Sequence, residues 1–236
     1  MPGIDSNTVL MLHADGTNGS TTFIDSSASA HTLTANGGAQ ISTTQNKFGG
    51  ASAYFDGNGD TLTIPAASDW ELGTGDFCID FWVRFGSGSF TSGYYPFVVG
   101  NRTSDSDRWY VIFNGTNGTG CRMVSGNGFS VTESSQPEYD TWYHYAISRL
   151  SGSVHIYRDG VRAATASLSA SLSPGGSLTI CGRGTDTAEG YLNGYIDELR
   201  ISKGAARIDD SDDPLYCGGD PADGFTPPAY SYTDKR

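Results

Sequence analysis

Short stretches that alternate apolar and polar residues recur along this chain, and clusters of Gly, Asn, Asp and Ser separate them. The clearest stretch is Phe77–Phe85, whose odd-numbered positions are all apolar while its even-numbered positions include Asp80 and Arg84. A period of two is typical of a strand that buries one face. We therefore predict a strand here, with the odd-numbered residues facing inward.

Similar patterns predict strands along most of the chain. We expect them at residues 8–12, 51–55, 61–64, 109–113, 142–149, 153–158, 161–165, 178–181 and 195–201. Asp159 and Gly160 are expected to form a tight hairpin turn between two of these strands. One turn of helix is expected near residues 203–207.

Turn signals recur throughout, and no long window has the 3.6-residue period of a helix. The pattern predicts an all-β protein, an antiparallel β-sandwich of the jelly-roll type. Because the expected strands follow one another without a linker, we predict one domain over residues 1–208. Residues 209–236 begin with an acidic insertion and continue as an extended tail, which we expect to pack back on the same domain.

Charge narrows the classes of partner. The 236 residues include 26 Asp and Glu against 14 Lys and Arg, which gives a formal net charge of −12. A surface this acidic repels the phosphate backbone, so nucleic acid is excluded as a partner. No apolar run approaches the ~18 residues that a membrane helix needs, which excludes a membrane partner. The first residues lack the pattern of a signal peptide, so we expect synthesis in the cytoplasm.

Several blocks in order carry a family resemblance. They are His13-Ala14-Asp15-Gly16, Lys47-Phe48-Gly49-Gly50-Ala51, Tyr157-Arg158-Asp159-Gly160 and Tyr195-Ile196-Asp197-Glu198-Leu199-Arg200-Ile201. Together they resemble the concanavalin A-like lectin/glucanase superfamily in its laminin G-like form. The resemblance implies a jelly roll over almost the whole chain.

A narrower resemblance involves residues 15–23, 200–207 and 225–228. These segments are similar to the version of the domain found in tailed-bacteriophage virion proteins. That resemblance implies a non-enzymatic structural protein of the virion, made and assembled in the host cytoplasm. It would act as a capsid decoration (cement) protein or a head or tail appendage, adhering to phage capsid or tail proteins. It also implies a homo-oligomer, with a trimer favoured.

The acidic insertion departs from the pattern of these virion proteins. It carries Asp209, Asp210, Asp212 and Asp213. The ordinary interpretation of such an acidic run is a surface segment exposed to solvent. We predict instead that these four residues contact a specific partner, because this is where the chain differs from the family that it resembles.

Some members of the superfamily are glucanases, so the carboxylates of this chain must be compared with those that a glycosidase needs. Retaining glycosidases need two carboxylates about 5–5.5 Å apart. The related laminarinases place Glu, Asp and Glu on alternate positions of one strand. The nearest counterpart here, Asp76 to Asp80, has Cys78 in the middle and no Glu. Asp197 and Glu198 are adjacent, so we expect them on opposite faces of a strand. The prediction is that the protein is not an enzyme.

Calcium is the cofactor to consider. Asp56 and Asp60 flank a Gly-rich turn, and a cation between them would relieve their mutual repulsion. The resemblance adds Asp25 and Asp197 as further ligands of a structural Ca²⁺. The alternative is that these aspartates cap turns by accepting hydrogen bonds from backbone N–H groups.

A lectin-like module that binds host surface glycans is the alternative function, with or without calcium. Sugar rings stack on exposed aromatic side chains. Tyr94 and Tyr95 lie in a predicted loop, and Trp70, Trp109 and Tyr191 are further candidates. For each of them the alternative is an ordinary packing role.

Overall fold

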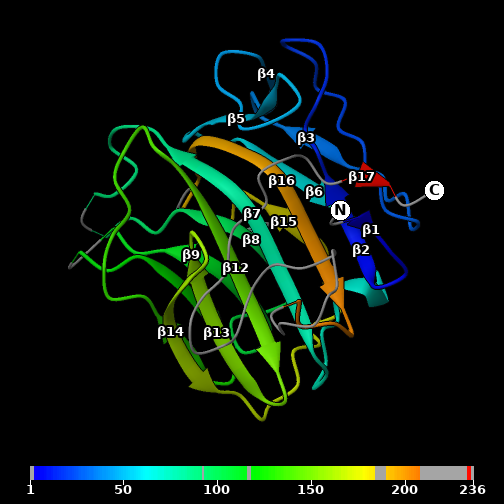
Figure 1. The fold of residues 1–236 in the computed structure, drawn as a ribbon, viewed down its shortest axis with the longest axis vertical. Coiled ribbons are helices and arrows are strands. Elements are labelled where there is room, and N and C mark those ends of the chain that lie inside the picture. Colours follow the sequence, from blue (N-terminus) through cyan, green and yellow to red (C-terminus); the bar gives the residue numbers. More distant parts are fainter. Residues whose placement is uncertain (1–2, 92, 116–117, 184–189, 208–232, 235–236) are drawn as a thin grey trace.

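Two antiparallel sheets lie face to face and enclose the core (Figure 1). The computed structural model describes residues 3–91, 93–115, 118–183, 190–207 and 233–234. The predicted all-β class and the antiparallel sandwich are confirmed. The single short helix among the described residues is a 3₁₀ turn at Ser68–Trp70.

One sheet has seven strands. Their order is β11 (Ser130–Thr132), β10 (Cys121–Ser125), β9 (Arg108–Phe113), β8 (Phe97–Arg102), β15 (Leu178–Ile180), β6 (Thr61–Ile64) and β3 (Thr34–Asn36). All the pairings in this sheet are antiparallel. The long strands β8 to β10 therefore lie together at one end of the sheet.

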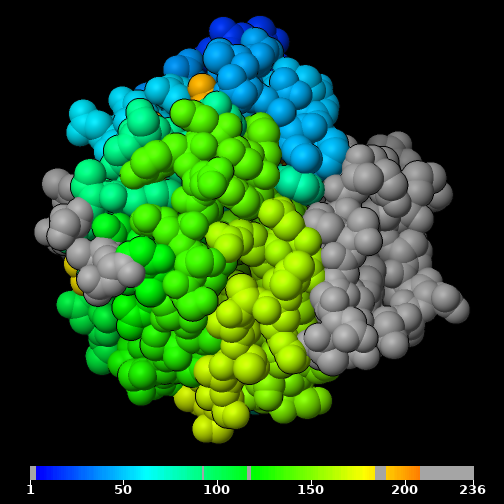
Figure 2. Space-filling model, turned by 60° about the vertical axis from the view of Figure 1, so that its left-hand side comes forward, coloured from blue at the N-terminus to red at the C-terminus, as the bar shows by residue number. Residues whose placement is uncertain are grey.

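The other sheet has eight strands. Their order is β14 (Val161–Ser167), β13 (Ser153–Arg158), β12 (Trp142–Leu150), β7 (Phe77–Phe85), β16 (Asn193–Lys203), β5 (Ser52–Asp56) and β4 (Gln40–Ser42), while β2 (Thr8–Leu12) pairs with the second half of β16. The edge strands β14 and β11 lie in contact, which brings the two sheets together at this side. Figure 2 shows green and yellow-green residues next to one another on this part of the surface.

The core fills the space between the two sheets, as the alternation predicts. Every odd-numbered residue of β7 is fully buried in it. From the opposite sheet come Trp109, Val111 and Phe113 of β9, also fully buried. The outward-facing residues of the seven-stranded sheet lie on the side opposite this core.

Each predicted strand is present within two residues of its expected bounds. The strands β3, β4, β8, β10 and β11 are additional, as are the two-residue strands β1 (Gly3–Ile4) and β17 (Thr233–Asp234). The helical turn expected near residues 203–207 is wrong. The N–H groups of Lys203 and Gly204 donate instead to Asn7 O and Asp76 O, and Gly204 adopts a left-handed φ of 83°. The backbone there is held by neighbouring loops and cannot form a helix.

Most of the tail is outside the described residues, and so are Asp209, Asp210, Asp212 and Asp213. Of residues 209–236, the structure describes Thr233–Asp234 as strand β17, which pairs in parallel with β1 (Gly3–Ile4). Within the described part of the chain, no helix has the length and hydropathy required to span a membrane.

Candidate functional site in a groove on the seven-stranded sheet

A groove lies on the outer face of the seven-stranded sheet, with a cavity volume of about 420 Å³. It exists because β9 alternates: Trp109 and Val111 point into the core, whereas Arg108, Tyr110 and Ile112 point outward. Strands β8 and β10 flank β9 and add their own outward residues. The period of two that builds the core therefore also builds the groove.

The floor of the groove is apolar and tightly packed. Phe97, Tyr110 and Ile112 form a buried cluster, and Val124 packs against it. The rings of Phe97 and Tyr110 meet edge to face, with their centroids 4.7 Å apart. The Tyr110 hydroxyl donates to Arg183 O over 2.9 Å. These contacts fix the floor before any ligand arrives.

Gly100 is required beneath this floor. It pairs with Tyr110 across the strands, and a Cβ at Gly100 would lie 2.1 Å from Tyr110 Cδ1. The missing side chain lets the tyrosine ring lie across strand β8. Any larger residue would push the ring up into the groove.

Aromatic rings and hydroxyl groups form the rim. Tyr95 enters from the loop before β8 and is 37% exposed. Phe129 stands at the turn between β10 and β11, half-buried, with its side chain packed against the main core. Ser130 pairs with the outward-facing Val124 and presents its hydroxyl group to the groove, whereas Ser125 pairs with Trp109 on the core face and its Oγ donates to Asn127 Oδ1. The rim thus offers apolar ring surface next to hydrogen-bonding groups.

Three arginines complete the lining: Arg108, Arg122 and Arg183. Asp105 Oδ1 accepts hydrogen bonds from Arg108 Nη1 at 2.5 Å and from Arg183 Nη2 at 3.0 Å. Desolvation raises the pKa of Asp105, but the surrounding guanidinium groups outweigh it and hold the pKa below its ordinary value. Arg122 Nε donates to Ser130 Oγ over 2.9 Å. The described lining contains no Asp or Glu.

Of the aromatic residues predicted to bind glycan, only Tyr95 belongs to the described lining of this groove. The hydroxyl of Tyr94 donates to Tyr191 O over 2.6 Å, so these two residues tie neighbouring loops together. The prediction for Trp109 is wrong, as is that for Trp70. Both are fully buried, and Trp109 Nε1 donates to Trp70 O over 3.0 Å.

Sequence reasoning missed the three arginines and Phe129. A signal was present, because Arg108 and Arg122 occupy the polar positions of alternating strands. What the sequence lacked was the strand order that places β9 beside β10 and brings the loop with Arg183 over them.

The aspartates predicted to bind calcium have other partners. Asp25 accepts hydrogen bonds from the backbone N–H groups of Met11, Ser27 and His31. The Asp60 carboxylate accepts from the N–H groups of Gly38 and Asp56. No group of three or more His, Cys, Asp or Glu among the described residues is arranged to hold a metal ion. Asp25 and Asp60 each accept from backbone N–H groups, as the turn-capping alternative expects, and the four predicted ligands do not form such a group.

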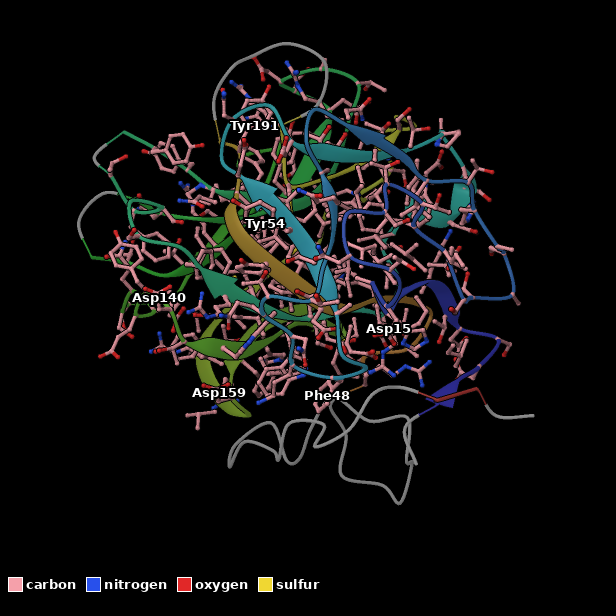
Figure 3. The ribbon with its side chains drawn as sticks, turned by 90° about the horizontal axis from the view of Figure 1, so that it is seen from above. Asp15, Phe48, Tyr54, Asp140, Asp159 and Tyr191 are labelled. Atoms are coloured by element: carbon pink, nitrogen blue, oxygen red, sulfur yellow. The ribbon has the colours of Figure 1, made fainter. Side chains whose placement is uncertain are left out.

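Asp197 is held in a different way. Its Oδ2 accepts from the N–H groups of Lys47 and Phe48, at 2.8 and 3.0 Å. Burial, with the nearby carboxylates of Glu198 and Asp15, raises the pKa of Asp197 to about 7. This set lies well away from Tyr191 (Figure 3). Asp197 is a buried carboxyl group that holds its proton to a higher pH than an exposed aspartate does.

The expectation that Asp197 and Glu198 face opposite sides of a strand is wrong. Pairing of β16 is irregular between Asp197 and Arg200, and Glu198 has a left-handed φ of 52°. Its Oε1 lies 2.9 Å from His13 Nδ1. The irregular backbone brings the two carboxylates close enough for Glu198 to affect the pKa of Asp197.

Asp80 of strand β7, which ends the counterpart of the laminarinase pattern, forms a buried ion pair. Arg200 Nε and Nη2 donate to the Asp80 carboxylate at 3.0 and 3.3 Å, and both side chains are fully buried. Burial raises the pKa of Asp80, but Arg200 outweighs it and holds the pKa well below its ordinary value. This carboxylate stabilises the fold and faces no solvent.

Comparisons with known proteins agree with this fold. Domain 4 of AbnA, an extracellular arabinanase of Geobacillus stearothermophilus solved with arabinotriose, is 17% identical with a TM-score of 0.62, and the match covers 85% of this chain and 94% of that domain. The binding domain of Paraclostridial Mosquitocidal Protein 1 is 18% identical with a TM-score of 0.64, over 84% of this chain and 49% of that one. The botulinum neurotoxin serotype D binding domain is 13% identical with a TM-score of 0.60, over 85% and 49%.

The chain thus spans about half the length of the toxin binding domains that it matches. A search of curated protein sequences found no match. The model of the concanavalin A-like lectin/glucanases superfamily, in its laminin G-like form, matches residues 56–210. Since this is more than half of the chain, the protein belongs to the concanavalin A-like lectin/glucanases superfamily.

Proposed function

We propose that this protein is a non-catalytic adhesion module that binds glycans in the groove of its seven-stranded sheet. The observation that carries the proposal is the lining, where the exposed ring of Tyr95 shares the groove with the Ser130 hydroxyl and arginine donors. A sugar needs both kinds of surface. Its C–H face packs on aromatic rings, and its hydroxyl groups exchange hydrogen bonds with polar side chains.

The rigidity of the site supports binding. The floor residues are packed against one another and anchored to the sheet, so little side-chain entropy is lost when a ligand docks. The likeness to AbnA Domain 4, a structure that holds arabinotriose, supports the same class of ligand.

The distribution of carboxylates supports a role without catalysis. Hydrolysis of a glycosidic bond by the usual mechanism needs two carboxylates facing the sugar. The described lining of the groove has none. Asp80 and Glu198 are buried and bonded to Arg200 and His13.

A glycan array probed with the purified protein tests the proposal, followed by calorimetry on any positive glycan. Tyr95→Ala should weaken binding about tenfold, because a stacked ring is lost. Tyr139→Ala is the matched control: Tyr139 is 40% exposed and does not line the groove. An array that stays blank, or a control variant that loses as much affinity as Tyr95→Ala, would overturn the assignment.

We also propose that the module acts on the virion of a tailed phage, on the capsid or the tail, as the resemblance of residues 15–23 and 200–207 implies. A glycan-binding adhesion module on a particle is compatible with such a place. Quantitative mass spectrometry of purified particles should find the protein, with a copy number that separates capsid decoration from a tail appendage. Light scattering of the purified protein should give a trimer. Absence from particles would refute the virion role and leave the glycan proposal intact.

A further inference from the structure

We propose that the groove selects acidic sugars, glycans that carry a carboxylate or sulfate group, over neutral ones. This inference rests on the proposed glycan-binding function. It comes from a contrast in charge. The chain as a whole has 26 acidic against 14 basic residues, yet the described lining of the groove has three arginines and no acid.

The nearby acidic residue does not neutralise these arginines. Asp105 Oδ1 accepts from Arg102 at 3.2 Å, in addition to Arg108 and Arg183. Three guanidinium groups thus share a single carboxylate, which is itself 66% exposed. The other acid of this loop, Asp107, accepts from Thr103 Oγ1 over 3.0 Å. Among the described residues, this end of the groove has three guanidinium groups against the carboxylates of Asp105 and Asp107, and Asp105 holds the guanidinium groups in place.

A second cation stands at the other end of the floor. Arg122 pairs with Ile112 across the strands, and Val124 pairs with Tyr110. Arg108 is two residues before Tyr110, so Arg108 and Arg122 bracket the pair formed by Tyr110 and Val124. At about 3.4 Å per residue, this four-residue offset places the backbones of the two arginines about 14 Å apart along the strands. This is the span of a short oligosaccharide.

The chemistry of these groups favours an oxyanion on a sugar ring. Guanidinium groups bind carboxylate and sulfate through paired, charge-assisted hydrogen bonds. The apolar floor and the exposed Tyr95 ring favour an anion that is attached to a group with a flat apolar face, which a bare inorganic anion lacks. An acidic sugar has both an oxyanion and an apolar ring face. Because Arg108 and Arg122 lie at opposite ends of the floor, its anionic group can bind an arginine at either end.

Matched glycans provide the test. Calorimetry compares lactose, 3′-sialyllactose and 3′-sulfolactose, which share one neutral core, after an array with neutral, carboxylated and sulfated glycans. We expect the preferred acidic glycan to bind at least about tenfold more tightly than its neutral counterpart. The carboxylate and sulfate arms identify which oxyanion is preferred. Equal or tighter binding of neutral glycans would overturn this inference and leave the proposed function standing, whereas a blank array would overturn the function itself.

Substitutions test which arginines cause the preference for acidic glycans. Arg122→Gln should reduce affinity for the acidic glycan about tenfold and leave affinity for the neutral core nearly unchanged, and Arg108→Gln should do the same. The matched control is Arg162→Gln, which removes the same charge from an exposed position of β14 in the other sheet. Thermal melts confirm that each variant is folded. An Arg162→Gln protein that loses as much affinity, or an Arg122→Gln protein that keeps the full acid preference, would contradict the proposal.

Discussion

The buried carboxyl group of Asp197 should make this protein less stable as the pH rises, and Asp197→Asn should remove that dependence. Asp197 is fully buried, and burial together with Glu198 and Asp15 raises its pKa from 3.8 to about 7. The folded protein therefore holds this proton to a higher pH than the unfolded chain does. The stabilisation from the proton is complete below the unfolded pKa and is lost as the pH rises through about 7.

The magnitude follows from linkage. Each unit of pH between the two pKa values costs about 1.4 kcal/mol of unfolding free energy. Between pH 5 and pH 8 the loss from this one group is about 2–3 kcal/mol. Asparagine does not titrate, and its side-chain oxygen can still accept from the N–H groups of Lys47 and Phe48. The variant should thus gain stability relative to the natural protein as the pH rises.

Urea unfolding of both proteins at pH 5, 6, 7 and 8, with EDTA present throughout, measures this difference. Other groups with shifted pKa values, such as Glu133, contribute equally to both proteins and cancel in the difference. We expect the stability of Asp197→Asn minus that of the natural protein to rise by about 2–3 kcal/mol over this range. A difference that stays constant with pH would refute the assignment of a buried, protonated Asp197.

Three further perturbations test the fold and the floor of the groove. Arg200→Met removes the guanidinium group that donates to the buried Asp80 carboxylate and should cost about 3–5 kcal/mol in urea unfolding, whereas removing both charges with Asp80→Asn and Arg200→Met together should recover part of that loss. EDTA should leave the melting temperature unchanged and added Ca²⁺ should not raise it, and a rise would show a calcium site outside the described residues. Gly100→Ala should cost about 1–3 kcal/mol, since its Cβ meets the Tyr110 ring, and should also weaken glycan binding; an unaltered melt would show that the ring is free to move.

Most of the strands could be predicted because alternation is a local property. In β7 the odd-numbered residues face the core, as their pattern predicts. The same pattern predicts that the even-numbered residues face solvent, and this is wrong for Asp80, which is also fully buried. Its partner Arg200 is 120 positions away, and only the pairing of β7 with β16 brings the two together. A charged residue in an alternating strand therefore does not by itself identify the solvent face.

Candidate sites were predicted less well than strands, for a related reason. Asp56 and Asp60 do converge across a short turn, as their spacing predicts, but the Asp60 carboxylate turns to the N–H groups of Asp56 and Gly38. Spacing gives proximity and does not give direction. The groove was harder still to predict, because Arg108, Arg122 and Arg183 come from separate segments that meet only when the sheet is assembled.

The position of a cationic groove in a protein of net charge −12 determines how its selectivity should respond to salt. At long range the whole molecule repels an acidic glycan, so electrostatic steering does not speed its association. The attraction comes from guanidinium groups at hydrogen-bond distance, well inside the screening length of about 8 Å at physiological ionic strength. Salt therefore screens the long-range repulsion more than the contact itself. We expect the acid preference to persist at 0.15 M NaCl, measured by the calorimetry described above, with an association rate that does not fall as salt is added. A preference present only at very low ionic strength would indicate a diffuse attraction and would locate the selectivity outside the arginine pair at Arg108 and Arg122.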